Sequence, residues 1–274
     1  MRIILELKSN GNYSYDLRYH HKVQGFIYNL LKNTGFNELH DKKGYKFFCF
    51  SNIIPPKDIK QGLHVCLIIS SPDEDLIRRF EEHLFSILGK NISLGEYSFN
   101  MRSAKIAPTL IRRDISIDTG TPIIIRIPKS KFGEYGIKHG GEYVYWSPRK
   151  GDPFEPFIKQ LEENLIKKYI TFHNLSKEQA ETMESNALPL FQELNFKKSV
   201  CNHVIIDGQE HKVYGSLWKF NFQNLNKQQQ ALLEFGLDTG LGEKNSLGFG
   251  FVNACQNARG SYMQKGASPE GTVG

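Results

Sequence analysis

The sequence has no long hydrophobic run and few cysteines, and each shortage excludes a class of protein. No stretch of about 18 apolar residues exists, so no helix is expected to span a membrane. The N-terminus turns polar after Leu7, which does not fit a secretory signal peptide. The cysteines stand far apart and predict no disulfide framework, so we expect a protein of the reducing cytoplasm. They are Cys49, Cys66, Cys201 and Cys255.

Several common catalytic and cofactor motifs are also missing. The chain contains no HExxH, no CxxC and no GxxxxGK[ST], which excludes a zincin, a zinc ribbon and a P-loop ATPase. It has neither a GxSxG elbow nor the GxGxxG fingerprint of a nicotinamide site. The isolated histidines have no partners at metal-ligand spacing. We therefore expect no metal and no cofactor.

Composition and charge fit a globular protein of two domains. The 274 residues are 39% hydrophobic and 23% charged, which argues against disorder. Lys and Arg number 35 against 29 Asp and Glu, a net charge of +6 that is compatible with a polyanionic partner. Pairs of basic residues recur in the second half, and each is typical of a solvated surface. They are Arg112-Arg113, Lys129 with Lys131, Lys167-Lys168 and Lys197-Lys198.

The first hundred residues alternate between strand and helix patterns. A short apolar strand is predicted at 2–8, and apolar residues at helical spacing predict a helix at 19–32. Strands at 46–53 and 63–70 precede a second helix from 71, and a last strand or strand pair covers 91–106. This βαββαβ order is that of a ferredoxin-like domain.

The second half repeats this order loosely. Strands are predicted at 121–128, 192–200, 211–222 and 246–254, with helices at 155–172 and 226–240. The fold class is therefore α+β, with two tandem ferredoxin-like (RRM-like) domains whose antiparallel sheets carry helices on one face. We place the N-terminal domain at 1–107 and the C-terminal domain at 108–255. The small, polar and glycine-rich tail at 256–274 is predicted to be disordered.

A glycine-rich segment near the C-terminus is the most distinctive feature of the sequence. Two Gly-apolar-Gly brackets, Gly240 with Gly242 and Gly248 with Gly250, enclose five mostly polar residues. Glycine permits positive φ and close approach of a ligand, and successive N–H groups can form an anion-binding concavity. The alternative is a glycine-rich hairpin that merely turns. The doubled bracket favours binding of a phosphate backbone by the glycines and the polar residues between them, Lys244, Asn245 and Ser246.

This segment resembles the signature of the repeat-associated RNA-binding superfamily of CRISPR systems. The run GLGEKNSLGFGFV, from Gly240 to Val252, is similar in particular to the CRISPR repeat-processing endoribonucleases, the Cas-six family. The run QGFIYN, from Gln24 to Asn29, is similar to the first helix of that family. The order of elements extends the resemblance over about 250 residues.

The resemblance implies a catalytic group of Tyr28, His40 and Lys46. In archaeal-type members a Tyr of the first helix, a following His and a Lys a few residues later form the active site. Tyr28 lies roughly 130° from the centre of its helix's apolar stripe, so it is not expected to point into the core. His21 faces the same way and is the rival catalytic histidine, whereas adjacent His20 is predicted to pack. We prefer His40 because it lies in a loop with basic neighbours.

These residue types suit metal-independent RNA cleavage. The 2′-hydroxyl attacks the adjacent phosphate in line and leaves a 2′,3′-cyclic phosphate and a 5′-hydroxyl. This needs a base, an acid and a cation, and a histidine with a pKa of about 6.5 can serve in either proton transfer. Lys46 suits the role of the cation that stabilises the charge of the phosphorane. Tyr28 could orient the 2′-hydroxyl or make the proton transfer that His40 does not make.

The resemblance thus implies an endoribonuclease that cleaves precursor CRISPR RNA within the repeat. Its expected partner is CRISPR repeat RNA, with other CRISPR effector subunits and a second copy of the chain as further candidates. One alternative is a non-catalytic guide-RNA-binding subunit of an effector complex, against which His40 argues. Another is a ferredoxin-like regulatory module that binds a small metabolite, which the doubled glycine bracket does not favour.

Overall fold

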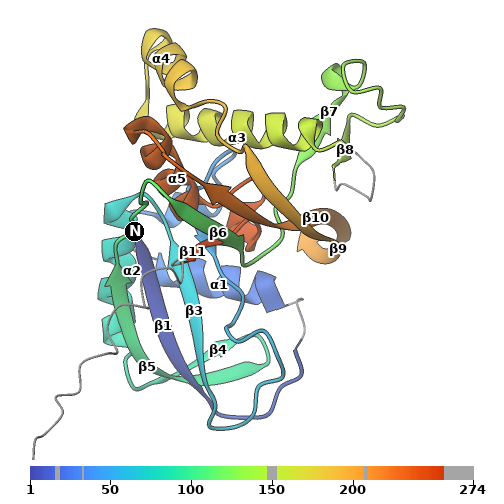
Figure 1. The fold of residues 1–274 in the computed structure, drawn as a ribbon. Helices are drawn as coiled ribbons and strands as arrows, with labels where there is room; N and C mark the ends of the chain where they lie inside the picture. The colour runs from blue at the N-terminus through green and yellow to red at the C-terminus, as the bar shows by residue number, and fades with distance from the viewer. Residues whose placement is uncertain (16–18, 33, 147–152, 207–208, 256–274) are drawn as a thin grey trace, which may run out of the picture.

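Two antiparallel sheets, one in the lower and one in the upper part of Figure 1, form the frame of the molecule. The computed structural model describes residues 1–15, 19–32, 34–146, 153–206 and 209–255. The predicted tail at 256–274 lies outside these residues. Among the described helices, none has the length and apolar character needed to cross a membrane.

The N-terminal sheet has the strand order β2-β3-β1-β5-β4, which is the ferredoxin-like order with one further edge strand. Alternate residues of the central strand β1 are buried, as expected of a strand with one face on a core. The strands are β1 Arg2–Ser9, β2 Cys49–Phe50, β3 His64–Ser70, β4 Asn91–Leu94 and β5 Tyr97–Ala107. The strand pair predicted for 91–106 is confirmed as the hairpin of β4 and β5.

Helices α1 (His20–Leu30) and α2 (Glu74–Ser86) pack on this sheet. Val23 and Ile27 lie on the buried face of α1 at helical spacing, and both are fully buried. The α2 helix begins at Asp73, whose carboxylate accepts a hydrogen bond of 3.0 Å from the Leu76 N–H. Both helices were predicted from their apolar stripes.

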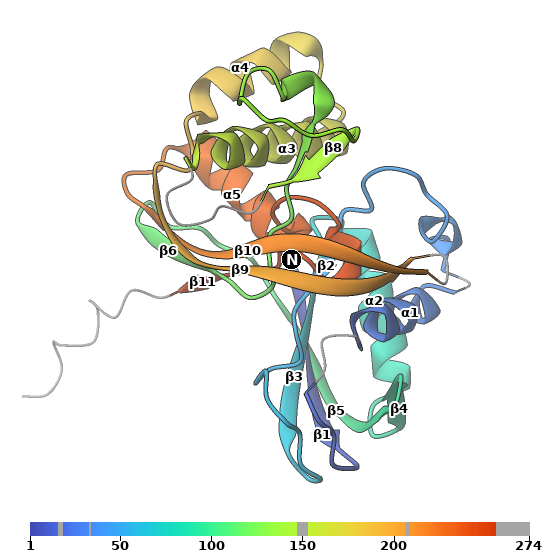
Figure 2. The ribbon, with the colours of Figure 1, turned by 90° about the vertical axis from the view of Figure 1, so that its right-hand side faces the viewer.

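The C-terminal sheet has the order β11-β6-β10-β9 and is again ferredoxin-like. Its strands are β6 Ile115–Thr119, β9 Glu193–Ile206, β10 Gln209–Phe222 and β11 Val252–Cys255. The helices are α3 Glu155–His173, α4 Lys177–Ala187 and α5 Lys227–Thr239. A separate ribbon of β7 (Arg126–Pro128) and β8 (Tyr143–Tyr145) stands beside the long β9–β10 hairpin (Figure 2).

Two strand predictions for this half have the wrong bounds. Of 121–128, only Arg126–Pro128 is a strand, β7 of the separate ribbon. The strand of the C-terminal sheet is β6 at Ile115–Thr119, and Ile123 and Ile124 make only isolated bridges, to Ser216 and Glu243. The apolar residues of 121–128 are buried where the chain crosses between the hairpin and the glycine-rich loop. The last strand starts at Val252 rather than at 246, since the preceding residues form a turn of 3-10 helix.

The buried hydrophobic residues form separate clusters on either side of one point in the chain. One cluster draws its fully buried members from Ile3 to Met101, and the other two draw theirs from Ile111 to Val252. On that basis we propose 1–107 and 108–255 as the two domains. A division near Ala107 falls between the end of β5 and the start of β6.

The two halves are joined by contacts of the first strand. The Arg2 guanidinium donates to the carbonyls of Leu237 and Val252 and to the Asn253 side chain, over 2.6 to 3.1 Å. It also stacks on the Phe251 ring at 5.0 Å. Arg2 belongs to β1, whereas its partners belong to α5 and to the segment of β11. Arg2 is thus one of the contacts that join the two halves, together with the Met1 ammonium on Asp238 and the Ser70 hydroxyl on the Leu237 carbonyl.

Candidate active site

The first helix and the loop after it bring together the three residues that the sequence predicts as catalytic. The Lys46 ammonium donates a hydrogen bond of 2.9 Å to the Tyr28 hydroxyl and one of 2.5 Å to the His40 carbonyl. The Tyr28 and His40 rings meet edge to face, with centroids 4.9 Å apart. Tyr28, His40 and Lys46 thus form one cluster at the surface.

The local backbone explains how the loop returns to the helix. Gly35 and Gly44 have φ of +85° and +90°, so the chain reverses twice between Tyr28 and Lys46. Behind the cluster, the buried Phe48 ring packs against Tyr28 at 6.0 Å. This contact holds Tyr28 in place while the loop stays at the surface.

The His40 ring is oriented by its neighbour in the chain. Its Nδ1 lies 2.6 Å from the Asp41 carboxylate, with 66% of the His40 side chain exposed. A hydrogen bond from Nδ1–H to Asp41 selects the tautomer that has its lone pair on Nε2. Proton transfer with a substrate would then use Nε2.

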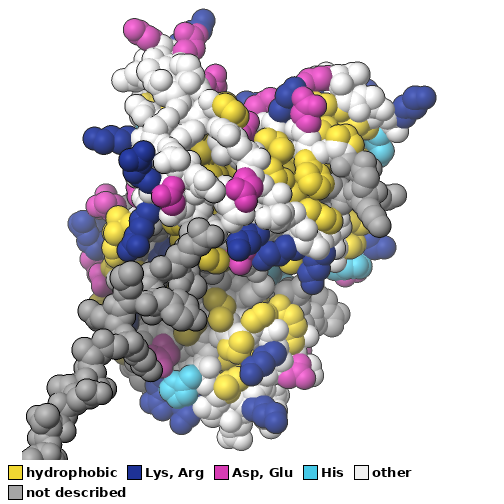
Figure 3. Space-filling model, viewed as in Figure 1, with side chains coloured by type: hydrophobic (Ala, Val, Ile, Leu, Met, Phe, Trp, Pro, Cys, Tyr) yellow, Lys and Arg dark blue, Asp and Glu magenta, His cyan; other side chains and the backbone are white. Residues whose placement is uncertain are grey.

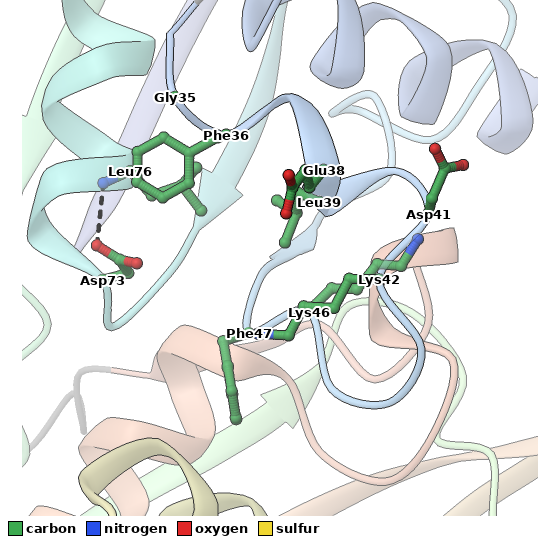
Figure 4. Close-up of a pocket in the computed structure, with 10 residues that line it drawn as sticks. All are labelled: Gly35, Phe36, Glu38, Leu39, Asp41, Lys42, Lys46, Phe47, Asp73 and Leu76. Atoms are coloured by element: carbon green, nitrogen blue, oxygen red, sulfur yellow. Dashed lines mark hydrogen bonds between the residues drawn. The ribbon is translucent and has the colours of Figure 1, made fainter.

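A pocket of about 630 Å³ opens next to Lys46 (Figure 4). It lies between the 35–47 loop and the start of α2, and both acidic and basic side chains line it. The charged ones are Glu38, Asp41, Lys42, Lys46 and Asp73. Across the described ranges, no group of three or more His, Cys, Asp and Glu residues is placed to hold a metal ion.

The rival histidine, His21, lies in a different environment. It lines a small pocket together with Asn202 and His203 of β9, whereas His40 and Lys46 lie beyond the other end of α1. The adjacent His20 is buried, as predicted, and its Nε2 lies 2.8 Å from the Asn52 carboxamide. Burial lowers the pKa of His20. The structure therefore groups His40, and not His21, with Tyr28 and Lys46.

The glycine-rich loop is more buried than a free phosphate-binding loop would be. Its four bracket glycines are buried with φ between 70° and 86°. The Asn245 carboxamide donates to the carbonyls of Leu241 and Phe249, which closes the loop. Several of its backbone N–H groups already donate to carbonyls of the protein: those of Leu241, Glu243, Leu247, Gly248 and Gly250. RNA contact by this loop stays a prediction, and its central residues, 243–247, are the part that is only partly buried.

A buried lysine beneath this loop was missed in the sequence. Lys168 of α3 is 2% exposed, and its ammonium donates to the carbonyls of Gly240 and Gly242 and to the Asn245 side chain. Burial lowers the pKa of Lys168 to about 7. The prediction that Lys167-Lys168 form a solvated surface is wrong for Lys168. Its spacing of three from Leu165, on the apolar stripe of α3, is the signal that could have found it.

Comparison with known proteins matches this chain to one family. Residues 105–254 match the family described as CRISPR associated protein Cas6, C-terminal. A CRISPR-associated endoribonuclease Cas6 of Methanocaldococcus jannaschii is 33% identical over 92% of this chain and 99% of its own length. The chain belongs to the Cas6 family. A Cas6 endoribonuclease of Haloferax mediterranei is 26% identical over 94% of this chain and 95% of its own length.

Solved structures of Cas6 proteins share the fold. One described as CRISPR associated protein Cas6 has a TM-score of 0.64 and 23% identity, and the match covers 93% of this chain and 99% of that one. A Cas6-related protein from Pyrococcus furiosus has a TM-score of 0.60 and 19% identity, over 93% and 98% of the two chains. The prediction of tandem ferredoxin-like domains is confirmed by this likeness and by the two sheet orders.

Proposed function

We propose that this chain cleaves precursor CRISPR RNA within the repeat, as a metal-independent endoribonuclease. The observation that carries the proposal is the convergence of Tyr28, His40 and Lys46 at the end of α1. Membership of a family of CRISPR-associated endoribonucleases supports it. These three side chains offer two groups for proton transfer and one cation.

In the proposed reaction the 2′-oxygen forms a bond to the adjacent phosphorus and the bond to the 5′-oxygen breaks. One proton leaves the 2′-hydroxyl and one is delivered to the 5′-oxygen, so the products are a 2′,3′-cyclic phosphate and a 5′-hydroxyl. His40 makes one of these transfers through Nε2, with Tyr28 on the opposite side. Lys46 stabilises the negative charge of the phosphorane.

The proposed substrate is CRISPR repeat RNA, which reaches the site along the central residues of the glycine-rich loop. Lys244, Asn245 and Ser246 are only partly buried and are the residues of this loop that we expect to touch RNA. Other CRISPR effector subunits and a second copy of the chain are its proposed further partners. Its proposed compartment is the cytoplasm, in keeping with four free cysteines.

Cleavage of a labelled repeat RNA in excess EDTA tests this function. We expect one cut, which is lost in His40→Ala and lost when the sugar at the scissile step is 2′-deoxy. His21→Ala is the matched control and should cut at the wild-type rate. If His40→Ala cuts and His21→Ala does not, the histidine is misassigned. If wild type binds the RNA without cutting it, the chain is a guide-RNA-binding subunit.

A further inference from the structure

Three tyrosines form a ladder on the β7–β8 ribbon and the β9–β10 hairpin. The rings of Tyr143 and Tyr145 have centroids 5.5 Å apart, and those of Tyr145 and Tyr214 are 6.3 Å apart. Tyr143 and Tyr214 are 41% and 44% exposed, which is unusual for large aromatic side chains. In Figure 3 hydrophobic side chains gather between the ribbon and this hairpin.

The ladder borders two cavities that share Tyr143. The first, of about 790 Å³, lies between the ribbon and the hairpin and is lined by Tyr143, Tyr145 and Tyr214. The second, of about 430 Å³, lies between the ribbon and α3 and is lined by Tyr143 and Tyr45. Tyr45 directly precedes Lys46. The two cavities therefore extend from Tyr45, the residue before Lys46 in the chain, to Tyr214.

The acidic side chains around the second cavity are neutralised by basic neighbours. Each of its acidic side chains is already paired with a basic one: Glu142 with Lys129, Glu163 with Lys131 and Lys167, and Glu243 with Arg126. Lys244, next to Glu243, adds a further cation. The lining itself holds Arg126 and Lys167 with three acidic side chains, and together with the cationic partners outside it these leave none of the carboxylates unpaired beside the exposed rings.

The rings of the tyrosine ladder are held in position before any ligand binds. The Arg126 guanidinium stacks on the Tyr143 ring at 4.7 Å. Tyr145 packs against a buried cluster that includes Ile124 and Val213. Because the rings are fixed, stacking on them costs little side-chain entropy.

We propose that Tyr45, Tyr143, Tyr145 and Tyr214, the tyrosine track, hold a single-stranded part of the RNA that leads away from the cleavage site. Bases stack on Tyr143 and Tyr214, and phosphates face Lys167 and Lys244. The proposal rests on the proposed function for the identity of its ligand. Stacking needs only the flat face of a base, so the track binds RNA with little preference for sequence.

The test measures binding of a fluorescein-labelled repeat RNA whose scissile sugar is 2′-deoxy. Tyr143→Ala and Tyr214→Ala should each weaken its Kd about tenfold, as expected for loss of one stacked base. Tyr143→Phe and Tyr214→Phe keep the ring and should restore the wild-type Kd. Phe85→Ala, at a side chain 53% exposed on α2, is the matched control and should bind as wild type does.

Abasic sugars placed one at a time in the same RNA give a second readout. Removal of a base that stacks on Tyr143 weakens binding of the RNA to wild type, and weakens binding to Tyr143→Ala no further.

Alanine variants that bind the RNA within twofold of wild type overturn the tyrosine track, while cleavage of the all-ribose RNA by wild type leaves the proposed function standing. Wild type that binds without cutting overturns the function, and the tyrosine comparison still decides the track. Failure of wild type to bind the RNA overturns both.

Discussion

Lys46 is the residue that links the candidate catalytic group. Its ammonium donates both to the Tyr28 hydroxyl and to the His40 carbonyl, so it sets the distance between the helix and the loop. The same ammonium lies over the Tyr28 ring at 5.1 Å. A change at Lys46 therefore removes a charge from the candidate site and two hydrogen bonds that hold the loop.

Replacing Lys46 should slow cleavage far more than it weakens binding. Loss of one cationic donor to a developing charge typically costs about 10² to 10³ in rate. We expect this loss for Lys46→Ala in single-turnover cleavage, with partial recovery in Lys46→Arg. Lys43→Ala, at an exposed lysine of the same loop, is the control and should cut normally. A larger loss for Lys43→Ala would transfer the role to Lys43.

Gly250 is a position where only glycine fits. A Cβ there would lie 1.8 Å from the Leu241 carbonyl oxygen, and φ is +71°. The left-handed conformation alone costs a non-glycine residue about 1 to 3 kcal/mol, and the clash adds to it. Thermal unfolding of Gly250→Ala should show this loss of stability. Gly133→Ala, where a Cβ meets nothing within 4 Å, should unfold with the wild type.

At the scale of elements, α3 and the glycine-rich loop are joined by Lys168. Burial lowers the pKa of Lys168 to about 7 in the folded protein, whereas in the unfolded chain it has its ordinary value of 10.5. Between these two values the unfolded chain binds more protons than the folded one. The contribution of Lys168 to the free energy of unfolding therefore rises from pH 7 towards pH 10.5. Below pH 7 the full free-energy cost of burying its charged ammonium is present.

This dependence can be isolated with Lys168→Met. The free energy of unfolding of wild type, minus that of the variant, should rise between pH 7 and pH 10 by at most about 1.4 kcal/mol per pH unit. Urea unfolding at a series of pH values measures it. The variant should also be less stable at pH 7, because buried carbonyls lose their donor. A difference that is flat with pH would show that Lys168 stays charged in the folded protein.

The sequence predicted elements well where burial is one-sided and poorly where it is not. The stripe of Val23 and Ile27 predicted α1, since one face of that helix meets a sheet. The apolar run around Ile123 and Ile124 has no such pattern, because it is buried without joining a ladder. The α4 helix was missed because only Met183 and Ala187 of its residues are buried. Polar helices carry little periodicity.

The same limit applies to the candidate site. Resemblance to a family indicated Tyr28, His40 and Lys46, and the structure brings them into contact. Neither the tyrosine track nor Lys168 followed from the pattern, because each depends on packing between segments far apart in the sequence. A lysine beside another lysine is typical of a surface, and only the fold reveals that Lys168 is buried.

At the scale of the molecule, Arg2 should control how firmly the two sheets are joined. Arg2→Ala removes three hydrogen bonds of a partly buried guanidinium, each of about 1.5 to 3 kcal/mol in favourable cases. We expect faster hydrogen exchange in β11 and the end of α5, and a lower Tm. Arg78→Ala, at an arginine 65% exposed on α2, should leave both unchanged. Equal effects of the two variants on hydrogen exchange and Tm would show that Arg2 does not stabilise the junction of the two sheets.

The position of the candidate catalytic residues in the chain has an evolutionary consequence. Tyr28, His40 and Lys46 all lie before Ala107, whereas the glycine-rich loop and three members of the tyrosine track lie after it. Recombination between 107 and 111 would therefore exchange most of the surface proposed to bind RNA while it left the proposed chemistry intact. Groups that pair across the two halves would have to be inherited in matching form, among them Arg2 with Val252 and Asn253, Met1 with Asp238, and Asn52 with Gly120. Such chimaeras could be built between this chain and its relatives in the Cas6 family.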